Sequence, residues 1–346
     1  MMNNNIQQLV RKNIRSLAPY SSARDEYTGT EGIFLDANEN PFGTYNRYPD
    51  PYQSVLKQQL AKLKSINPNK IFIGNGSDEI IDLAFRIFCE PYKDKALIFS
   101  PTYGMYEVSA NINAVELIKL PLNAAFQIDM NGLLPHLTDE KLKLIFICSP
   151  NNPTGNLLNT EDIEFILNNF NGIVLIDEAY IDFCNQPSFI EKLNTVSNLI
   201  VSQTLSKAWG LAGVRLGIAY MNPEILSYYN KVKAPYNISA VNQKVALDAI
   251  SKEVEFRQKV NEILAEKEKM IQELPQLTTV KKIYPSDANF LLVEVEDAND
   301  LYTKLVEQQI IIRNRNAVVK NCIRITIGTA AENQQLLNAL KKITNG

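Results

Sequence analysis

The sequence predicts an α/β protein in which a large domain with a doubly wound, mostly parallel sheet is joined to a smaller α+β domain. Through the first two-thirds of the chain, short apolar runs alternate with amphipathic stretches of helical periodicity. This pattern is typical of strands and helices that alternate around a parallel sheet. A long charged helical stretch and a second group of strands and helices follow. The length of 346 residues suits one large domain with a smaller companion.

Five short runs predict the strands of the main sheet, because they are apolar on both faces. These runs are Ile71–Ile73, Ala96–Phe99, Leu144–Cys148, Ile173–Ile176 and Leu199–Val201. Helices are expected between them, for example over Glu79–Phe88 and Glu161–Phe170. In the first of these helices, Ile80, Leu83 and Ile87 share one face.

From Val241 to Leu274 the sequence predicts one long helix that bridges two domains, since no breaker occurs before Pro275. The segment beyond it predicts three strands and two helices: strands at Asn289–Val295, Ile310–Arg313 and Cys322–Ile327, and helices at Ala298–Gln308 and from about Ala331. We therefore expect an N-terminal arm at residues 1–30 that contains one short helix. A large domain at residues 31–240 and a small C-terminal domain at residues 241–346, packed with the arm, complete the expected chain.

Composition excludes several classes of function. Thirty-five Lys and Arg against 38 Asp and Glu leave a net charge of −3, so no bulk attraction to nucleic acid is expected. The longest apolar run, at 172–176, is far shorter than the roughly 20 residues of a membrane span. The first residues lack the apolar core of a signal peptide, so we expect a cytoplasmic protein. One histidine and four scattered cysteines without a CxxC pair predict neither a catalytic triad nor a metal site.

Lys207 is a candidate for covalent chemistry. It follows a predicted strand, in the segment SQTLSKAWGLAGVRLG at Ser202–Gly217. Most lysines are solvated surface residues, but the apolar neighbours of this one would lower its pKa, and a desolvated amine is the kind that forms a Schiff base. Three polar side chains nearby are enough to bind a phosphate: Thr204, Ser206 and Arg215.

A carboxylate and an amide follow two further predicted strands. Asp177 ends the apolar run of LIDEAYIDF, where carboxylates of open α/β sheets face the ligand crevice. Such an aspartate can hold a pyridine nitrogen protonated, although an N-cap or a magnesium ligand is the common alternative for an isolated acidic pair. Tyr180, three residues later, is placed to hydrogen-bond a phenolate oxygen. The turn SPNNPTG presents Asn152 to the same crevice.

Two more strand ends carry candidate ligand contacts. The turn GNGSDE leads from a strand into a helix, and the N–H groups of Gly76, Ser77 and Asp78 there form a cradle for a phosphate. Ordinary helix capping would also explain this turn. Tyr103, in PTYGMY, follows another strand and is able to stack on a flat ring.

Four more segments complete the pattern: PYSSAR at Pro19–Arg24, LDANENPF at Leu35–Phe42, YPDP at Tyr48–Pro51 and RITIGT at Arg324–Thr329. Together with the five strand ends, they resemble the fold-type-I pyridoxal-phosphate enzymes of the aspartate aminotransferase family. Within it, the resemblance is closer to the histidinol-phosphate aminotransferases. It covers nearly the whole chain and implies the fold of the fold-type-I transferases.

The resemblance implies that pyridoxal 5'-phosphate is the cofactor and that the protein is a homodimer with shared active sites. Lys207 would form the Schiff base and later move a proton, and Asp177 would pair with the pyridine nitrogen. Asn152 and Tyr180 would hold the ring oxygen, and Tyr103 would stack on the ring. The implied phosphate contacts are Gly76, Ser77, Asp78, Thr204, Ser206 and Arg215, with Tyr48 reaching the phosphate of the neighbouring subunit.

The resemblance also implies a reaction in histidine biosynthesis, in which an amino group moves between histidinol phosphate or imidazole-acetol phosphate and glutamate or 2-oxoglutarate. Arg324 would take the substrate anion, and Arg313 and Tyr20 would add phosphate contacts. The family often has an arginine where Gln203 stands and a phenylalanine where Trp209 stands. The segment between Pro41 and Tyr48 is also short. None of these departures removes a cofactor contact, but the short segment would affect the substrate pocket and therefore specificity.

Three alternatives stay open at this point. An aromatic-amino-acid aminotransferase would share every cofactor residue and differ only in the substrate pocket. A threonine-phosphate decarboxylase has similar phosphate-binding needs but releases CO₂. A transaminase-like sensor of a transcription regulator would need an attached DNA-binding domain, which we do not expect in the roughly 30 residues before the first family motif.

Overall fold

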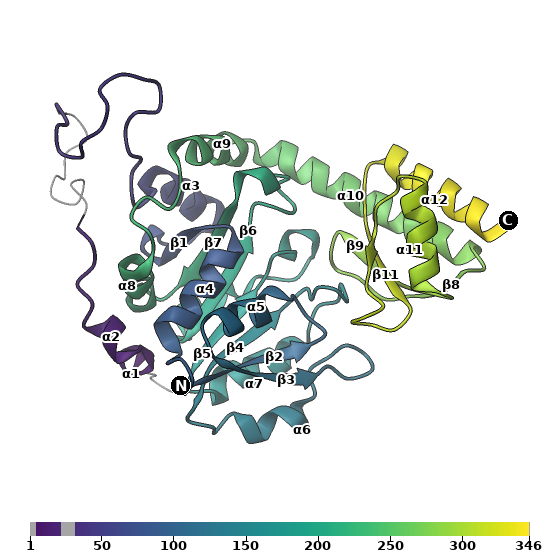
Figure 1. Cartoon of the computed structure of the whole chain (residues 1–346), viewed down its shortest axis with the longest axis horizontal. Coiled ribbons are helices and arrows are strands. Elements are labelled where there is room, and N and C mark those ends of the chain that lie inside the picture. Colours follow the sequence, from purple (N-terminus) through teal and green to yellow (C-terminus); the bar gives the residue numbers. More distant parts are fainter. Residues whose placement is uncertain (1–4, 22–31, 346) are drawn as a thin grey trace.

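The computed structural model describes residues 5–21 and 32–345. A seven-stranded sheet in the order β1-β7-β6-β5-β4-β2-β3 lies at the centre of the larger part (Figure 1). Its strands are β1 (Ile71–Asn75), β2 (Lys95–Ser100), β3 (Glu116–Pro121), β4 (Leu142–Cys148), β5 (Ile173–Asp177), β6 (Leu199–Thr204) and β7 (Leu216–Met221). Only β7 of these strands runs against the others, because it pairs antiparallel with both β1 and β6. The mostly parallel sheet is therefore confirmed.

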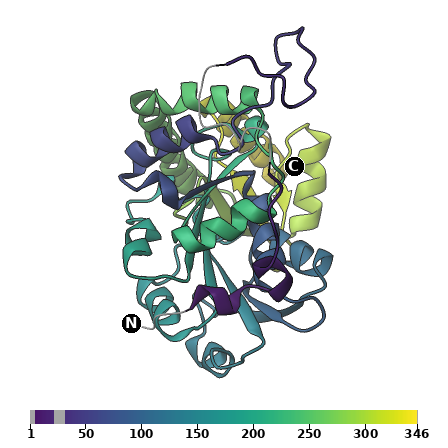
Figure 2. The same ribbon diagram turned by 90° about the vertical axis from the view of Figure 1, so that its left-hand side faces the viewer.

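Both faces of this sheet are buried, as the apolar strands predict. Neighbouring residues of β4 show this, since Ile145 and Ile147 lie in one apolar cluster while Leu144 and Phe146 lie in the other. Helices cover the two faces (Figures 1 and 2). They include α3 (Ser54–Lys64), α4 (Ser77–Phe88), α5 (Met105–Ile112), α6 (Met130–Leu133), α7 (Thr160–Asn169) and α8 (Pro223–Val232).

Two strands of the large sheet were not predicted. β3 is an edge strand whose residues are half-buried or exposed, and Glu116 and Lys119 interrupt its apolar pattern. β7 begins directly after Arg215, so its first residues Leu216 and Gly217 belong to the segment that also contains Lys207. The edge position of β3 leaves it without a continuous apolar run, and β7 overlaps the end of the lysine segment.

The expected single helix from Val241 to Leu274 is wrong. The structure has α9 (Ala240–Ile250) and α10 (Glu253–Glu273), separated at Ser251 and Lys252. The Ser251 hydroxyl donates to the carbonyl oxygen of Asp248 at 2.8 Å, and the backbone of Lys252 leaves the helical region. Ser227 forms the same kind of bond inside α8 without ending that helix, so the break carries no strong sequence signal.

α10 leads from the large sheet to a second, four-stranded sheet in the order β10-β11-β9-β8 (Figure 1). The strands are β8 (Val280–Ile283), β9 (Phe290–Val295), β10 (Arg313–Asn314) and β11 (Cys322–Thr326). Two helices, α11 (Ala298–Glu307) and α12 (Ala330–Asn345), share an apolar core with this sheet. β8 was not predicted, and β10 is shorter and later than the expected strand at Ile310–Arg313.

The described part of the N-terminal arm packs on the large sheet's side of the molecule, not on the second sheet as expected. It forms two short helices, α1 (Ile6–Leu9) and α2 (Lys12–Arg15), rather than one. Ile6, Val10 and Ile14 are buried in the apolar cluster around α4 and α8, and Figure 1 shows both helices far from the second sheet. Apolar burial next to α8 decides this placement.

None of the helices in the described ranges combines the length and the apolar character that crossing a membrane requires.

Candidate active site

A cavity of about 490 Å³ lies where the carboxyl ends of β2, β4, β5 and β6 approach the second sheet. Ligands of open α/β sheets bind at such strand ends. The cavity brings together most of the predicted site residues, from both halves of the chain. Those that line it are Ser77, Asp78, Tyr103, Asn152, Asp177, Tyr180, Thr204, Ser206, Lys207, Arg215, Arg313 and Arg324.

One end of the cavity is a cradle at the start of α4. Gly76 has a φ of +74°, and a Cβ added to it would lie 2.6 Å from Nη2 of Arg215. Glycine therefore permits both the turn and the close approach of the guanidinium. Arg215 Nη2 lies 3.4 Å from Oδ2 of Asp78, and the hydroxyl-bearing residues Ser77, Thr204 and Ser206 complete this end.

Asp177 lies at the last position of β5 and is buried. The Tyr106 hydroxyl donates to its Oδ2 at 2.8 Å, and the Ala179 N–H donates to its Oδ1 at 3.1 Å. Burial raises the pKa of Asp177 to about 6, although the hydrogen bond from Tyr106 opposes that rise. Burial destabilises the ionised carboxylate, so a cationic group bound next to Asp177 would stabilise it.

Lys207 lines the same cavity as Asp177 and the arginines of the second sheet. Its side chain reaches solvent through the cavity, yet protein atoms surround it closely enough that desolvation lowers its pKa. The positive charge of Arg324 is the next cause of the lowered pKa. Its Nζ lies 5.7 Å from the centre of the Tyr180 ring, and no carboxylate within the described ranges forms an ion pair with it. The direction of the predicted pKa shift is confirmed.

Tyr103, Asn152 and Tyr180 form the walls of the cavity. The Tyr103 hydroxyl donates to Oδ1 of Asp78 at 3.0 Å. Asn152 is buried, and its Oδ1 accepts a hydrogen bond from Arg324 Nη1. Tyr180 is buried edge-on against Phe290 of the second sheet. Asn152 and Tyr180 therefore connect the strand ends of the large sheet to the second sheet.

Three arginines line the wall that the second sheet contributes: Arg313, Arg315 and Arg324. Arg313 lies directly opposite Arg324 in the antiparallel pair of β10 and β11. Arg315 was not predicted, although the alternation in Arg313-Asn314-Arg315 was a usable signal, since residues two apart in an extended chain lie on one face. The cavity thus holds one more cation than the sequence predicted.

Two predicted contacts are not at the cavity of their own chain. Tyr48 is 51% exposed and stacks on Tyr236 with ring centres 4.4 Å apart. Tyr20 is 71% exposed, and neither residue lines the cavity. Ser22, Ala23 and Arg24 of the PYSSAR segment lie outside the described residues. The roles of Tyr20 and Tyr48 stay predictions.

A further residue that the sequence did not single out is Tyr106, which is fully buried in α5. It ends the segment PTYGMY, in which Tyr103 is the residue predicted to stack on a ring. A buried tyrosine needs a hydrogen-bond partner for its hydroxyl. The sequence could therefore predict that a buried Tyr106 needs a partner, but not that the partner is Asp177.

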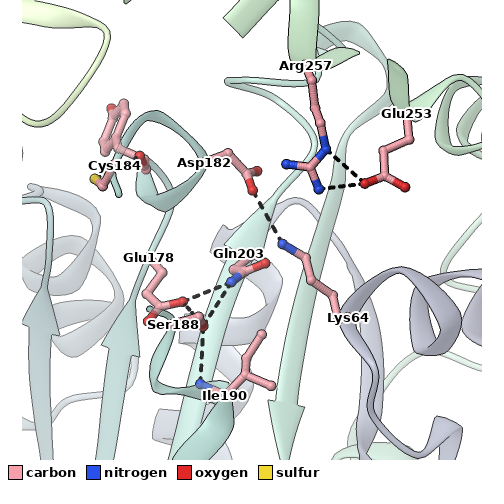
Figure 3. Close-up of polar contacts among 10 residues, drawn as sticks. Lys64, Glu178, Asp182, Cys184, Ser188, Ile190, Gln203, Glu253 and Arg257 are labelled. Carbon is pink, nitrogen blue, oxygen red and sulfur yellow. Dashed lines mark hydrogen bonds and ion pairs between the residues drawn. The ribbon is translucent and has the colours of Figure 1, made fainter. Parts of the chain in front are cut away.

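Gln203, one of the two substitutions that depart from the family pattern, is buried beside Glu178 and Ser188 (Figure 3). Its side-chain amide donates to Oε2 of Glu178 at 2.8 Å, and the Ser188 hydroxyl donates to the same oxygen at 2.5 Å. Burial raises the pKa of Glu178, while these bonds oppose the rise. The other departure, Trp209, stacks on Phe256 of α10 with ring centres 3.8 Å apart. Neither departure removes a group from the cavity.

Comparisons with known proteins agree with this geometry. A family model described as aminotransferase class I and II matches residues 27–340. The histidinol-phosphate aminotransferase of Parabacteroides distasonis is 52% identical over 341 residues, which cover 98% of this chain and 99% of that protein.

Solved structures show the same fold. The crystal structure of the histidinol-phosphate aminotransferase from Clostridium acetobutylicum superposes with a TM-score of 0.80 at 26% identity, covering 87% of this chain and 91% of that one. The enzyme of that name from Sinorhizobium meliloti, in complex with pyridoxal-5'-phosphate, gives 0.79 at 24% identity, covering 86% and 83%. Because the family model spans most of the sequence and a relative that is half identical covers almost all of it, the chain belongs to the class I and II aminotransferases.

Proposed function

We propose that this aminotransferase moves an amino group between histidinol phosphate and 2-oxoglutarate, giving imidazole-acetol phosphate and glutamate, with pyridoxal 5'-phosphate as its cofactor. The observation that carries the substrate assignment is the arginine wall of the cavity, which suits a strongly anionic group at the far end of the substrate. The names of its full-length relatives support the same substrate.

The donor set of the cavity fits this cofactor. Hydroxyl groups, the N–H groups at the start of α4 and Arg215 are phosphate ligands by chemistry. The cradle at Gly76 has no room for a Cβ beside Arg215. Asp177 supplies a buried acceptor for a protonated ring nitrogen, and Lys207 is an amine of lowered pKa on the same cavity. Tyr103 offers a flat face, and Asn152 offers an amide N–H group without an acceptor in the described part of the chain.

When bound, pyridoxal phosphate supplies an electron sink for the C–H bond that breaks next to the substrate nitrogen. Asp177 holds the proton on the ring nitrogen, and its burial strengthens that ion pair. Tyr106 fixes the orientation of the Asp177 carboxylate. Lys207 would remove the proton from the substrate Cα and deliver it to C4′ of the cofactor. A lowered pKa suits this role because more of the amine is neutral near pH 7.

Each of the two substrates carries an anionic group that Arg324 binds. In glutamate this group is a carboxylate, and in histidinol phosphate it is the phosphate. A guanidinium is a planar donor that accommodates either group. Asn152 holds the Arg324 side chain through its Oδ1, so the arginine is oriented before the substrate arrives. Such orientation lowers the entropy cost of binding.

The same proposal includes a homodimer in which Tyr48 reaches the cofactor phosphate of the neighbouring subunit. It also places the protein in the cytoplasm. Large apolar side chains before Tyr48 are mostly exposed in the single chain: Ile33, Leu35, Phe42 and Tyr45. A second copy that covers this segment would remove them from water. The division into an arm at 1–30, a large domain at 31–240 and a small domain at 241–346 belongs to this proposal as well, and Tyr20 is included as a substrate contact.

The experiment is to offer histidinol phosphate, phenylalanine and threonine phosphate separately with 2-oxoglutarate and to compare kcat/KM. We expect histidinol phosphate to be preferred, and histidinol without its phosphate to be worse by about 10⁴-fold, because the buried donors that pair with the phosphate are left unpaired. Equal activity on phenylalanine would indicate an aromatic aminotransferase. Release of CO₂ from threonine phosphate would indicate a decarboxylase.

A further inference from the structure

We propose that Arg315 is a third binding residue for the substrate's phosphate and that it makes this end of the cavity selective for dianions over monoanions. This inference rests on the proposed function, since it concerns the phosphate of the same substrate. The family resemblance implies roles for Arg313 and Arg324 but none for Arg315.

The backbone places Arg315 beside the other two arginines. Arg313 and Arg324 are cross-strand partners in the antiparallel pair β10–β11. The N–H of Arg315 donates to the carbonyl oxygen of Cys322 at 2.9 Å, which continues the pairing one step beyond the strand. Residues 313 and 315 therefore lie on the same face as residue 324, and all three side chains line the cavity.

The donors of this cluster are largely unused. Each guanidinium carries about five N–H donors. Within residues 5–21 and 32–345, the hydrogen bond from Arg324 to Asn152 is the single side-chain bond that the three form. The Nε atoms of Arg315 and Arg324 are buried without any partner in the described structure. Because a buried donor without an acceptor is destabilising, these atoms indicate a ligand that the cavity is built to hold.

The charge balance leads to the same conclusion. Like charges directly opposite in a β-pair are destabilising, and no ion pair to a carboxylate of the described chain relieves them. Burial, followed by the charges of Arg324 and Arg313, lowers the pKa of Arg315. The two carboxylates that line the cavity contact other groups, since Asp78 lies beside Arg215 and Asp177 accepts from Tyr106. An incoming anion is therefore the group that would neutralise the three arginines.

The number of charges decides which anion is preferred. Coulomb attraction scales with the product of the charges, so a third guanidinium adds twice as much attraction to a dianion as to a monoanion at the same position. A phosphate monoester carries nearly two negative charges above its second pKa of about 6, together with three acceptor oxygens. A carboxylate of glutamate carries one charge and two oxygens. Arg315 thus favours the phosphate substrate, while Arg324 alone suffices for glutamate.

The test measures binding of two small anions of equal shape to the holoenzyme by calorimetry, at a pH about two units above that second pKa of about 6. Methyl phosphate is the dianion and methyl sulfate the monoanion, and neither has an amino group to react. Arg315→Gln is compared with Lys320→Gln, which removes one positive charge from the same hairpin at an exposed residue outside the cavity. Arg315→Lys serves as a second variant that keeps the positive charge but loses the planar guanidinium with its several N–H donors.

We expect Arg315→Gln to weaken methyl phosphate binding by about tenfold or more, as for the loss of one charge-assisted hydrogen bond, and methyl sulfate binding by clearly less. Lys320→Gln should change neither by more than about twofold, and Arg315→Lys should retain most of the preference for the dianion. Equal losses for both anions, or a loss no larger than that of Lys320→Gln, would overturn the proposal.

A separate readout distinguishes this proposal from the proposed function. If wild type converts histidinol phosphate while Arg315→Gln binds methyl phosphate normally, the inference about Arg315 is wrong and the function stands. If wild type binds methyl phosphate in an Arg315-dependent way but does not convert histidinol phosphate, the substrate assignment is wrong. In that case the dianion site itself stands.

Discussion

The Tyr106 hydroxyl donates to Oδ2 of Asp177 at 2.8 Å, from a helix to the end of a strand 71 residues later. Both side chains are buried, so this contact orients the carboxylate while its surroundings disfavour its charge. The two effects oppose each other in the pKa of Asp177, which burial raises from 3.8 to about 6 despite the hydrogen bond.

This pKa predicts how stability depends on pH in the cofactor-free protein. Because the pKa of Asp177 is higher in the folded chain than in the unfolded one, ionisation of Asp177 costs stability as the pH rises from about 4 to about 6. Asp177→Asn cannot ionise. Its free energy of unfolding, relative to wild type, should therefore increase by about 2–3 kcal/mol between pH 4 and pH 7. Urea unfolding at a series of pH values measures this difference.

Tyr106→Phe provides a second arm for that experiment. Loss of a hydrogen bond to the ionised carboxylate should raise the pKa of Asp177 further, so the stability loss should still begin near pH 4 but continue to a higher pH. Parallel pH profiles for wild type and Asp177→Asn would show that Asp177 has an ordinary pKa in the folded chain.

Lys207 should be the residue that binds the cofactor covalently. Borohydride treatment of the holoenzyme, followed by peptide mapping, should place the pyridoxyl group on Lys207. Lys207→Ala should lower turnover by about 10³-fold or more, because the proton-transfer group is lost. The matched control is Lys57→Arg, since burial also lowers the pKa of Lys57, to about 8, but Lys57 does not line the cavity. A label on any other lysine contradicts the assignment.

Hybrid dimers test whether Tyr48 acts across a subunit interface. In a mixture of Tyr48→Phe and Lys207→Ala chains, each hybrid should have one intact site and one site with both changes. The intact site should have wild-type kcat, whereas action of Tyr48 within its own chain would leave no intact site. Phenylalanine keeps the stacking on Tyr236, so the hydroxyl alone is tested. Full activity of a monomer in sedimentation would rule out the shared site.

The two arginines that the sequence singled out should differ in their effects on the half-reactions. Arg324→Ala should slow the single-turnover reactions of histidinol phosphate and of glutamate by about 10–10² fold each, as both anions lose a charge-assisted bond. Arg313→Ala should slow the reaction of histidinol phosphate more than that of glutamate. Stopped-flow absorbance follows both reactions, and equal losses in the Arg313 variant would remove its special role.

Several parts of the fold could be predicted from the sequence for a physical reason. Strands apolar on both faces occur only in a covered sheet, so the runs at β1, β2, β4, β5 and β6 predicted both the sheet and its parallel character. The edge strand β3, with Glu116 and Lys119, lacked that signal. The break between α9 and α10 was hidden because the Ser251 side-chain bond that accompanies it is a local choice which many serines do not make.

What the sequence by itself determined is which residues come at the ends of parallel strands, and therefore that Asp177, Asn152 and Lys207 line one cavity. Parallel strands bring their carboxyl ends to one edge, whatever the details of packing. Only the tertiary structure decided the partners across that cavity. Arg315 joins the arginine wall because the β10–β11 register sets Arg313 opposite Arg324. Tyr106 reaches Asp177 because its ring packs on Phe146 of β4, the strand next to β5. Register and packing arise from interactions between distant segments, and a local pattern along the chain does not contain them.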